Sequence, residues 1–304
     1  MAKAIELIQI DKHYRDNWLR KKQTLFDVCL SVEEGEAFGF VGANGAGKST
    51  TIKIMMGLLK PTKGQAFLYG KPAVDPQARI GVGYVPENPL LYDLLTPMDI
   101  LQAVVRFHQR HSSGSRQNCM KVLESLSLAH VANKPLRGFS KGMVQRTALA
   151  QALVIEPRLL ILDEPLSGLD PVGRKEIVDI LGAYCANGGT VFFSSHVLHD
   201  VERLADRFGL IHQGKMQALC SVAEMAARST GFSVISCGES AVAELALTPL
   251  KKGLWKMSVD GARLWDVLQR LRDAGHSLAE VRPESNLEKM VLELNSPENS
   301  HARL

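Results

Sequence analysis

Cysteines are few in this sequence, and long runs of apolar residues are missing. Only 5 of its 304 residues are cysteine, they are scattered, and none forms a CxxC pair. We therefore expect reduced thiols, and neither a disulfide framework nor a zinc site. No apolar stretch approaches the roughly 18 residues that a membrane-spanning helix requires, so a membrane pore would have to come from another chain. The first nine residues also lack the basic and then apolar layout of a signal peptide.

An excess of charge of one sign is missing as well. The 36 lysines and arginines nearly balance the 32 aspartates and glutamates, and the formal net charge is +4. This balance gives no strong attraction to nucleic acid, so we expect no nucleic-acid partner. A mildly basic protein can lie near an anionic membrane face, although an ordinary surface charge explains the same number. The length favours one large domain with a smaller one, and the hydrophobic content of 45% allows a sizeable core.

Up to about Lys215, predicted strands alternate with predicted helices. We expect strands at residues 37–41, 65–68, 80–84, 159–162, 190–194 and 208–212, and helices at residues 49–59, 171–186 and 196–207. Between them, Thr96 is a predicted helix N-cap, with Pro97 at the first helical position and Asp99 closing a capping box. The chain from there to about Leu153 is mostly helical in pattern. This order predicts an α/β fold in which residues 1–215 form one domain with a helical subdomain at about 88–155.

The pattern changes after Lys215. Strands are expected at residues 232–236 and 254–259, and helices at residues 221–228, 263–274 and 286–294. The helix at 263–274 is amphipathic, because one face carries Leu264, Val267, Leu268 and Leu271. We therefore predict a small C-terminal α+β accessory domain over residues 216–304.

A glycine-rich loop lies between the first of the predicted strands and the helix after it. Its sequence, Gly42-Ala43-Asn44-Gly45-Ala46-Gly47-Lys48-Ser49-Thr50, fits the phosphate-binding pattern G-x-x-x-x-G-K-[ST]. Its glycines let the backbone turn tightly, so that N–H groups can point at phosphate oxygens. Lys48 is expected to reach the β- and γ-phosphates, and the Ser49 hydroxyl to bind Mg²⁺. A glycine-rich surface turn is the plainer alternative, but the strand–loop–helix context favours a nucleotide site lined by Gly42, Asn44, Gly45, Ala46, Gly47, Lys48, Ser49 and Thr50.

Two carboxylates follow the apolar strand at 159–162. Asp163 ends this strand, where a side chain at the carboxyl edge of a parallel sheet can face the phosphate loop and hold Mg²⁺ directly or through water. Glu164 is then placed to polarise the water that attacks the γ-phosphate. An acidic turn after a buried strand would be the commoner explanation if this segment stood alone. Together with the phosphate loop, the pair favours hydrolysis of a nucleotide.

Taken together, these segments resemble the nucleotide-binding domain of ABC transporters, over about Ile5 to Lys215. Residues 139–143 (FSKGM) are similar to the family's signature, usually LSGGQ, and residues 165–170 (PLSGLD) to the loop after the second carboxylate. His196 resembles the switch histidine that donates to the γ-phosphate, although a histidine after a strand can equally be structural. Tyr14 resembles the aromatic residue that stacks on adenine, although it could simply pack on the sheet. The resemblance implies a P-loop NTPase core with a mixed sheet and a helical subdomain.

The resemblance also implies that a second subunit completes the site. Ser140 is predicted to cap a helix whose N-terminus, with Lys141 and Gly142, meets the γ-phosphate of an ATP held by the opposite subunit. Asp170 would lie at the dimer interface, although a simple cap of the helix that begins at Pro171 is a fair alternative.

Two departures from the family pattern resemble one branch of it. Lys141 stands where the family usually has glycine, and Met143 where it usually has glutamine. Glu87 also replaces a usual glutamine; its carboxylate can still bind Mg²⁺ but cannot donate as an amide does. These changes, like the appendage after Lys215, resemble the ABC-2 type exporters.

The function implied by the resemblance is that of an ATP-hydrolysing transporter subunit. ATP and Mg²⁺ are the expected ligands, Lys48, Glu164 and His196 the expected catalytic residues, and Ser49, Glu87 and Asp163 the expected metal ligands. A second ATP-binding subunit, identical or different, and a membrane-spanning permease are the expected partners, which would hold the chain at the cytoplasmic face of the membrane. A soluble ABC ATPase acting on nucleic acid or ribosomes usually has two nucleotide domains, long coiled-coil insertions or basic arms, which we do not find in this sequence. Intact Glu164 and His196 argue against a third alternative, a regulatory ATP-sensing module.

Overall fold

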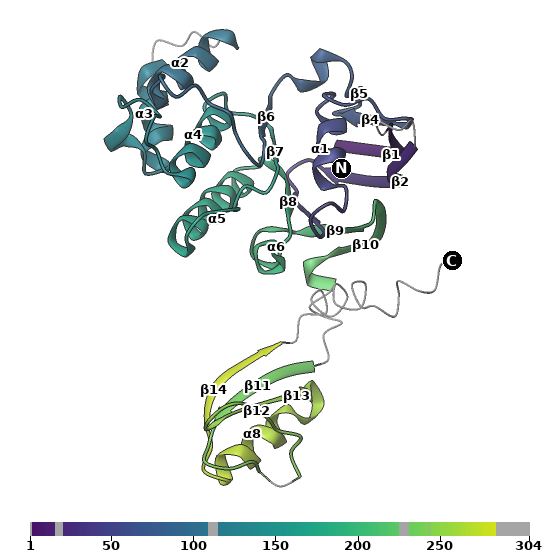
Figure 1. The fold of residues 1–304 in the computed structure, drawn as a ribbon, viewed down its shortest axis with the longest axis vertical. Coiled ribbons are helices and arrows are strands. Elements are labelled where there is room, and N and C mark those ends of the chain that lie inside the picture. Colours follow the sequence, from purple (N-terminus) through teal and green to yellow (C-terminus); the bar gives the residue numbers. More distant parts are fainter. Residues whose placement is uncertain (1, 16–20, 109–114, 225–230, 243, 284–304) are drawn as a thin grey trace. The chain divides into compact units, whose positions relative to one another are not determined.

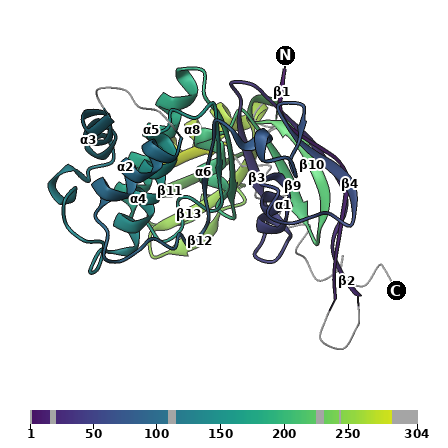
Figure 2. The ribbon, with the colours of Figure 1, turned by 90° about the horizontal axis from the view of Figure 1, so that it is seen from above.

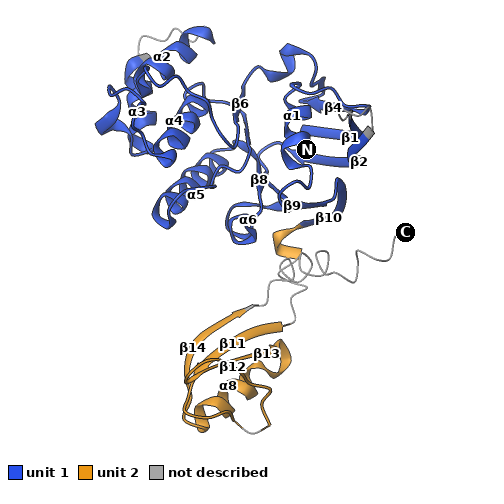
Figure 3. Ribbon diagram, viewed as in Figure 1, with its two compact units in different colours: residues 1–220 blue, residues 221–304 orange. Residues whose placement is uncertain are grey.

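The chain forms two compact units, residues 1–220 and 221–304 (Figure 3). The structure is a computed structural model, and it describes residues 2–15, 21–108, 115–224, 231–242 and 244–283. The predicted domain boundary at residue 215 falls at the start of strand β10 (Lys215–Ser221), most of which belongs to the first unit. Each unit is described by itself below.

A six-stranded sheet forms the centre of the first unit, in the order β10-β9-β3-β8-β7-β6 (Figure 1). Besides β10, its strands are β3 (Ala37–Val41), β6 (Val82–Val85), β7 (Leu159–Leu162), β8 (Thr190–Ser195) and β9 (Arg207–His212). The strands from β9 to β6 run parallel. Every residue of β3, β7 and β8 is buried. Burial on both faces explains why these strands are nearly continuous apolar runs in the sequence.

A second sheet is antiparallel and has the strand order β2-β1-β4-β5. Its first two strands precede the phosphate loop in the sequence, and the other two follow it. Its strands are β1 (Lys3–Arg15), β2 (Lys21–Glu33), β4 (Lys63–Leu68) and β5 (Lys71–Pro72). Neither β1 nor β2 is among the strands predicted from the sequence. The pairing of these two strands is irregular between Leu7 and Ile10, and Gln9 has a positive φ of 49°. A bulge of this kind interrupts the alternation of apolar and polar residues that marks a strand in a sequence.

Besides α4 (Lys141–Leu153), which contacts β6, three helices pack against these sheets. They are α1 (Lys48–Met55), α5 (Pro171–Ala186) and α6 (Leu198–Leu204). Helix α1 contacts β2 and β4, α5 contacts β8, and α6 contacts β3 and β8. The predicted bounds of α5 are confirmed, whereas α1 ends four residues before the predicted Leu59 (59 − 55). Helix α6 begins at Leu198 and leaves His196 in the turn after β8.

The predicted helical subdomain contains α2 (Pro97–Phe107), α3 (Ser115–Ser125) and α4 (Lys141–Leu153), which contact one another. They gather at one end of the first unit, away from α1 (Figures 1 and 2). The predicted capping box is confirmed: the Thr96 hydroxyl accepts from Asp99 N, and the Asp99 carboxylate accepts from Thr96 N. The Thr96 hydroxyl also donates to Asp99 Oδ2 at 2.6 Å, and this bond, followed by the one from Thr96 N, lowers the pKa of Asp99. Short 3₁₀ turns lie at Pro76–Arg79 and Ala129–Val131.

In its described residues, the second unit is a four-stranded antiparallel sheet, β12-β13-β11-β14, with one helix packed on it. Its elements are β11 (Gly231–Cys237), β12 (Thr248–Lys251), β13 (Leu254–Asp260), a 3₁₀ turn (Gly261–Arg263), α8 (Leu264–Asp273) and β14 (Ser277–Pro283). The apolar face predicted for α8 enters the core of this unit, formed by Val234, Met257, Val259, Leu264, Val267 and Leu271.

Two predicted helices fall wholly or partly outside the described residues. The helix at 286–294 lies outside them, and only residues 222–224 of the one at 221–228 are described, as helix. Within the described ranges, none of the helices has the length and hydropathy needed to cross a bilayer.

Candidate active site

The glycine-rich loop turns sharply between β3 and α1. Gly45 and Gly47 have positive φ angles of 80° and 114°, which side chains with a Cβ rarely adopt. A Cβ on Gly42 would lie 2.5 Å from the Ile211 carbonyl oxygen, and one on Gly47 would lie 2.6 Å from Leu25 Cδ2. The loop therefore needs glycine at these positions.

Lys48 is buried behind this loop, with 5% of its surface exposed. Its Nζ donates to the carbonyl oxygens of Gly42 at 2.6 Å and Ala43 at 3.3 Å. It also lies 3.1 Å from Glu164 Oε1, as an ion pair. Because an ammonium group has three donors, these three oxygens can use all of them. A phosphate oxygen that reaches Lys48 must therefore displace one of them.

Glu164 lies between Lys48 and His196. Its Oε1 pairs with Lys48, and its Oε2 lies 2.8 Å from His196 Nδ1. Because an ionised carboxylate only accepts, this second hydrogen bond requires a proton on Nδ1 and leaves Nε2 for another partner. Glu164 is 6% exposed, so its oxygens are held by these two side chains in a largely dry environment.

The backbone of Glu164 is also constrained. Its φ is +50°, a left-handed conformation that costs a residue with a Cβ about 1–2 kcal/mol. Its N–H donates to Ser194 Oγ at 2.8 Å, and Ser194 Oγ donates to Asp163 Oδ1 at 2.7 Å. One hydroxyl on the neighbouring strand β8 thus contacts both residues of the carboxylate pair.

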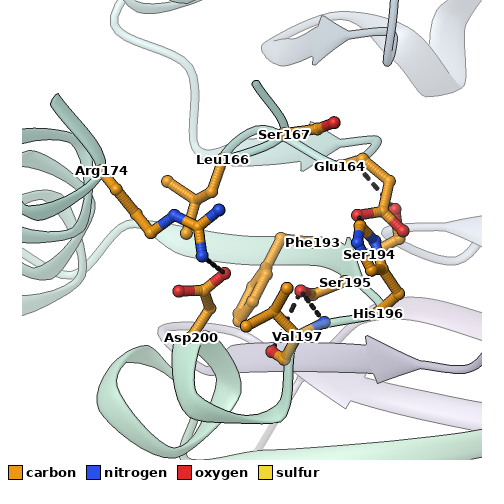
Figure 4. A pocket seen from close by; sticks show the side chains of 10 residues that line it. All are labelled: Glu164, Leu166, Ser167, Arg174, Phe193, Ser194, Ser195, His196, Val197 and Asp200. Atoms are coloured by element: carbon orange, nitrogen blue, oxygen red, sulfur yellow. Dashed lines mark hydrogen bonds and ion pairs between the residues drawn. The ribbon is translucent and has the colours of Figure 1, made fainter. Parts of the chain in front are cut away.

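A small pocket lies beside Glu164 and His196 (Figure 4). On its other side, Arg174 of α5 and Asp200 of α6 form an ion pair at 3.5 Å. Burial raises the pKa of Asp200, and the Arg174 guanidinium opposes this shift. The pair joins α5 to α6, the helix that begins two residues after His196.

The carboxyl ends of the parallel strands meet at one edge of the sheet. Val41 of β3 is paired with Ser195 of β8, and Val85 of β6 with Leu162 of β7. Asp163 follows β7 directly, and Glu87 follows β6 by two residues and is exposed. Ser49 is half-buried in the first turn of α1.

The segment at 139–143 begins helix α4. Ser140 is its N-cap, and its hydroxyl accepts from Met143 N at 3.3 Å. Ser140 and Lys141 are exposed. A Cβ on Gly142 would lie 3.2 Å from Leu169 Cδ2, so this turn packs on the loop at 165–170 of the same chain. Asp170 caps α5 by accepting from Gly173 N at 3.1 Å. This agrees with the simpler of its two predicted roles, the cap of the helix that begins at Pro171.

Tyr14 lies near the end of β1, opposite Lys22 of β2. Its ring is 40% exposed, and Lys12 Nζ lies 5.3 Å from the ring centroid. Lys12 is paired with Leu25, the residue that packs against Gly47. Tyr14 lies two residues, about 7 Å, beyond Lys12 along β1.

Comparison with known proteins identifies the family. The family model described as ABC transporter matches residues 25–167. An ABC transporter ATP-binding protein of Synechocystis sp. is 36% identical over 299 residues, which cover 96% of this chain and 83% of that protein. The chain belongs to the ABC transporter ATP-binding proteins. The bacitracin transport ATP-binding protein BcrA of Bacillus licheniformis is 38% identical over 193 residues, covering 62% of this chain and 61% of BcrA. The solved structure of an ATP-binding subunit of an ABC transporter has a TM-score of 0.67 and 30% identity, covering 74% of this chain and 92% of that chain.

These comparisons confirm the predicted family and the predicted P-loop NTPase fold. They also confirm that this ABC ATPase binds and hydrolyses ATP as a transporter subunit. The roles assigned to individual site residues stay predictions.

Sequence reasoning missed Ser194 and the Arg174–Asp200 pair. Ser194 follows the apolar residues Val191, Phe192 and Phe193 on β8 and is completely buried. A buried hydroxyl at the carboxyl end of a strand, beside the strand that carries Asp163, is the signal that could have found it.

Proposed function

We propose that this ABC ATPase works as a dimer that binds two ATP molecules with Mg²⁺ and drives export through a separate membrane permease. The observation that carries this proposal is the contact of Glu164 with both Lys48 and His196 at the edge of the sheet where the phosphate loop lies. A carboxylate in contact with a phosphate-binding lysine and a switch histidine is suited to orient a water at the γ-phosphate.

The residues at the sheet edge fit a magnesium ion. Asp163 is 3% exposed, and Ser194 occupies only one of its oxygens. Carboxylate and hydroxyl oxygens are hard ligands, which Mg²⁺ prefers together with phosphate oxygens and water. Ser49 and Asp163 would hold the ion, with Glu87 beside it, and the ion would neutralise charge on the β- and γ-phosphates.

The exposed signature turn supports a dimer. Ser140 and Lys141 are exposed at the N-terminus of α4, and α4 and α1 lie on different sides of the central sheet (Figures 1 and 2). The free N–H groups and positive end of α4 can therefore meet a γ-phosphate held by a second subunit. Lys141 would add a positive charge to that contact.

A group of exposed apolar side chains supports a permease partner. Leu90, Tyr92 and Leu94 are 97%, 81% and 79% exposed, in the segment between Glu87 and helix α2. Apolar side chains gathered in one exposed loop are typical of an interaction site. We propose that a cytoplasmic segment of the permease docks here, so that movement around Glu87 reaches the membrane. This would hold the chain at the inner face of the membrane.

Replacing this surface tests the permease contact. The double substitution Leu90→Ser and Leu94→Ser should remove the membrane subunit from material purified out of detergent-solubilised membranes, because it removes the apolar area that docks. Leu58→Ser, at a residue 64% exposed elsewhere in the first unit, is the matched control. Copurification that survives the double substitution would contradict this docking surface.

Export is favoured by the sequence features and by one relative. Lys141, Glu87 and the C-terminal unit resemble the ABC-2 exporters, and BcrA is named for bacitracin transport. The substrate path would lie in the permease, so this chain would supply the energy of transport.

Substitution of Glu164 tests the hydrolytic site and the dimer together. Glu164→Gln should keep ATP binding and lower kcat by at least about 100-fold, the range lost with a general base. With hydrolysis blocked, ATP should trap a dimer that is visible by size-exclusion chromatography with light scattering. Glu124→Gln, at an exposed position on α3, is the matched control. Wild-type turnover in Glu164→Gln would show that another group activates the water.

A further inference from the structure

We infer that Ser194 is a positioning residue for both carboxylates of the site. This inference rests on the proposed roles of Asp163 and Glu164, and it identifies the side chain that fixes the positions of these two residues. Ser194 is 0% exposed and lies on β8, next to the strand β7 that ends at Asp163. Its hydroxyl is 2.8 Å from Glu164 N and 2.7 Å from Asp163 Oδ1.

The direction of both hydrogen bonds follows from the partners. A backbone N–H can only donate, so Ser194 Oγ accepts from Glu164. An ionised carboxylate can only accept, so the single hydroxyl proton of Ser194 goes to Asp163. The hydroxyl therefore acts as donor to one residue and acceptor for the next, which an apolar side chain cannot do.

Each of the two hydrogen bonds of Ser194 constrains one part of the site. The bond from Glu164 N stabilises a backbone with a φ of +50°, which turns the Glu164 side chain toward Lys48 and His196. Without that bond, a more ordinary backbone conformation becomes competitive. The bond to Asp163 Oδ1 holds one carboxylate oxygen inside the protein and leaves the other for the cation. Groups that orient a metal ligand in this way typically change metal affinity or activity by about 10–100-fold when removed.

Figure 4 shows Glu164, Ser194 and His196 next to one another at the pocket. Ser195, the next residue, makes a different set of contacts. Its hydroxyl donates to the Val197 carbonyl oxygen at 3.1 Å and accepts from Val197 N at 2.9 Å, within its own turn. Of the two adjacent serines, Ser194 is the one bonded to the Asp163 carboxylate and to the backbone N–H of Glu164.

Three substitutions on β8 separate positioning from stability. Ser194→Ala removes the hydroxyl, and Ser194→Thr retains it. Thr190→Val is the matched control, because Thr190 is 1% exposed on the same strand and its hydroxyl accepts from Gly35 N instead. Tm measured by thermal unfolding should fall by similar amounts in Ser194→Ala and Thr190→Val, since each loses a buried hydroxyl.

The kinetic and binding results should differ. In Ser194→Ala we expect kcat to fall about 10–100-fold and the half-saturating Mn²⁺ concentration with ATP, followed by electron paramagnetic resonance, to rise about tenfold. ATP affinity in EDTA should stay within about threefold of wild type, because Lys48 and the loop are untouched. Thr190→Val should keep both kcat and Mn²⁺ affinity, and Ser194→Thr should recover most of kcat.

Two results would overturn the inference. One is a kcat in Ser194→Ala within about twofold of Thr190→Val. The other is equal loss of ATP affinity in EDTA and of kcat, which would indicate a general collapse of the site. If threonine is too large to fold, its lowered Tm will show this, and the comparison of Ser194→Ala with Thr190→Val still decides. Glu164→Gln measured beside them separates the two proposals: if Glu164→Gln is active, the proposed base is wrong, whereas an inactive Glu164→Gln with an active Ser194→Ala contradicts only the role of Ser194.

Discussion

The two units of this ABC ATPase bury different kinds of side chain. The first unit buries Lys48, Asp163 and Glu164 at the carboxyl edge of its parallel sheet. In the described part of the second unit, the buried polar residues are Ser233, Ser236 and His276, and no Lys, Arg, Asp or Glu is buried. His276 has a partner on each ring nitrogen, Ser236 Oγ at 3.0 Å and the Ser240 carbonyl oxygen at 2.8 Å.

This difference distinguishes side chains that are buried for the chemistry of the site from side chains that are buried to stabilise the fold. Removing a charge from water is expensive, and a buried ion pair often contributes little net stability compared with apolar packing. The core of the second unit is apolar, and its buried Ser236 and His276 are hydrogen-bonded to each other. We therefore attribute the burial of Lys48, Asp163 and Glu164 to their proposed roles in binding and hydrolysis of ATP, because a dry site strengthens their interactions with phosphate. The other buried carboxylates of the first unit, Glu36 and Asp200, pair with Arg207 and Arg174 instead.

The largest effect that we predict in this comparison of the two units is a loss of ATP affinity when the buried charge of Lys48 is removed. Lys48→Ala should weaken ATP binding by at least about 100-fold, because charge-assisted hydrogen bonds contribute about 1.5–3 kcal/mol each. Isothermal titration calorimetry measures this change. Lys53→Ala, at an exposed position on the same helix, is the control and should bind ATP like wild type. Unchanged affinity in Lys48→Ala would mean that the glycine-rich loop is not the phosphate site.

The strands at the site were largely predictable from the sequence. The bounds of β3 and β7 match the prediction, because buried parallel strands appear as uninterrupted apolar runs. The glycine-rich loop was recognisable because close approach of a backbone to phosphate demands glycine at fixed spacing. The fold class followed from the alternation of strands and helices.

The contacts within the site were not predictable in the same way. Strand order places β8 between β3 and β7, and nothing local in the sequence specifies that order. Only this arrangement brings Ser194 to Asp163 and Glu164, and it brings His196 to the same carboxylate. The start of α6 at Leu198 was also missed, because the two residues before it belong to a turn held by Ser195. Tertiary hydrogen bonds overrode the helical pattern there.

A smaller effect tests whether the second unit is independent of the chemistry. Leu271 is 0% exposed in the core of this unit, and Leu271→Ala should destabilise it by about 2–5 kcal/mol through the cavity it leaves. Trp255 and Trp265 lie in this unit and report its unfolding by fluorescence in urea. We expect kcat for ATP to stay near the wild-type value, whereas the matched Leu181→Ala, in the core of the first unit on α5, should lower turnover as it lowers stability. A parallel loss of kcat in Leu271→Ala would show that the second unit takes part in hydrolysis. It would contradict the assignment of ATP chemistry to the first unit alone.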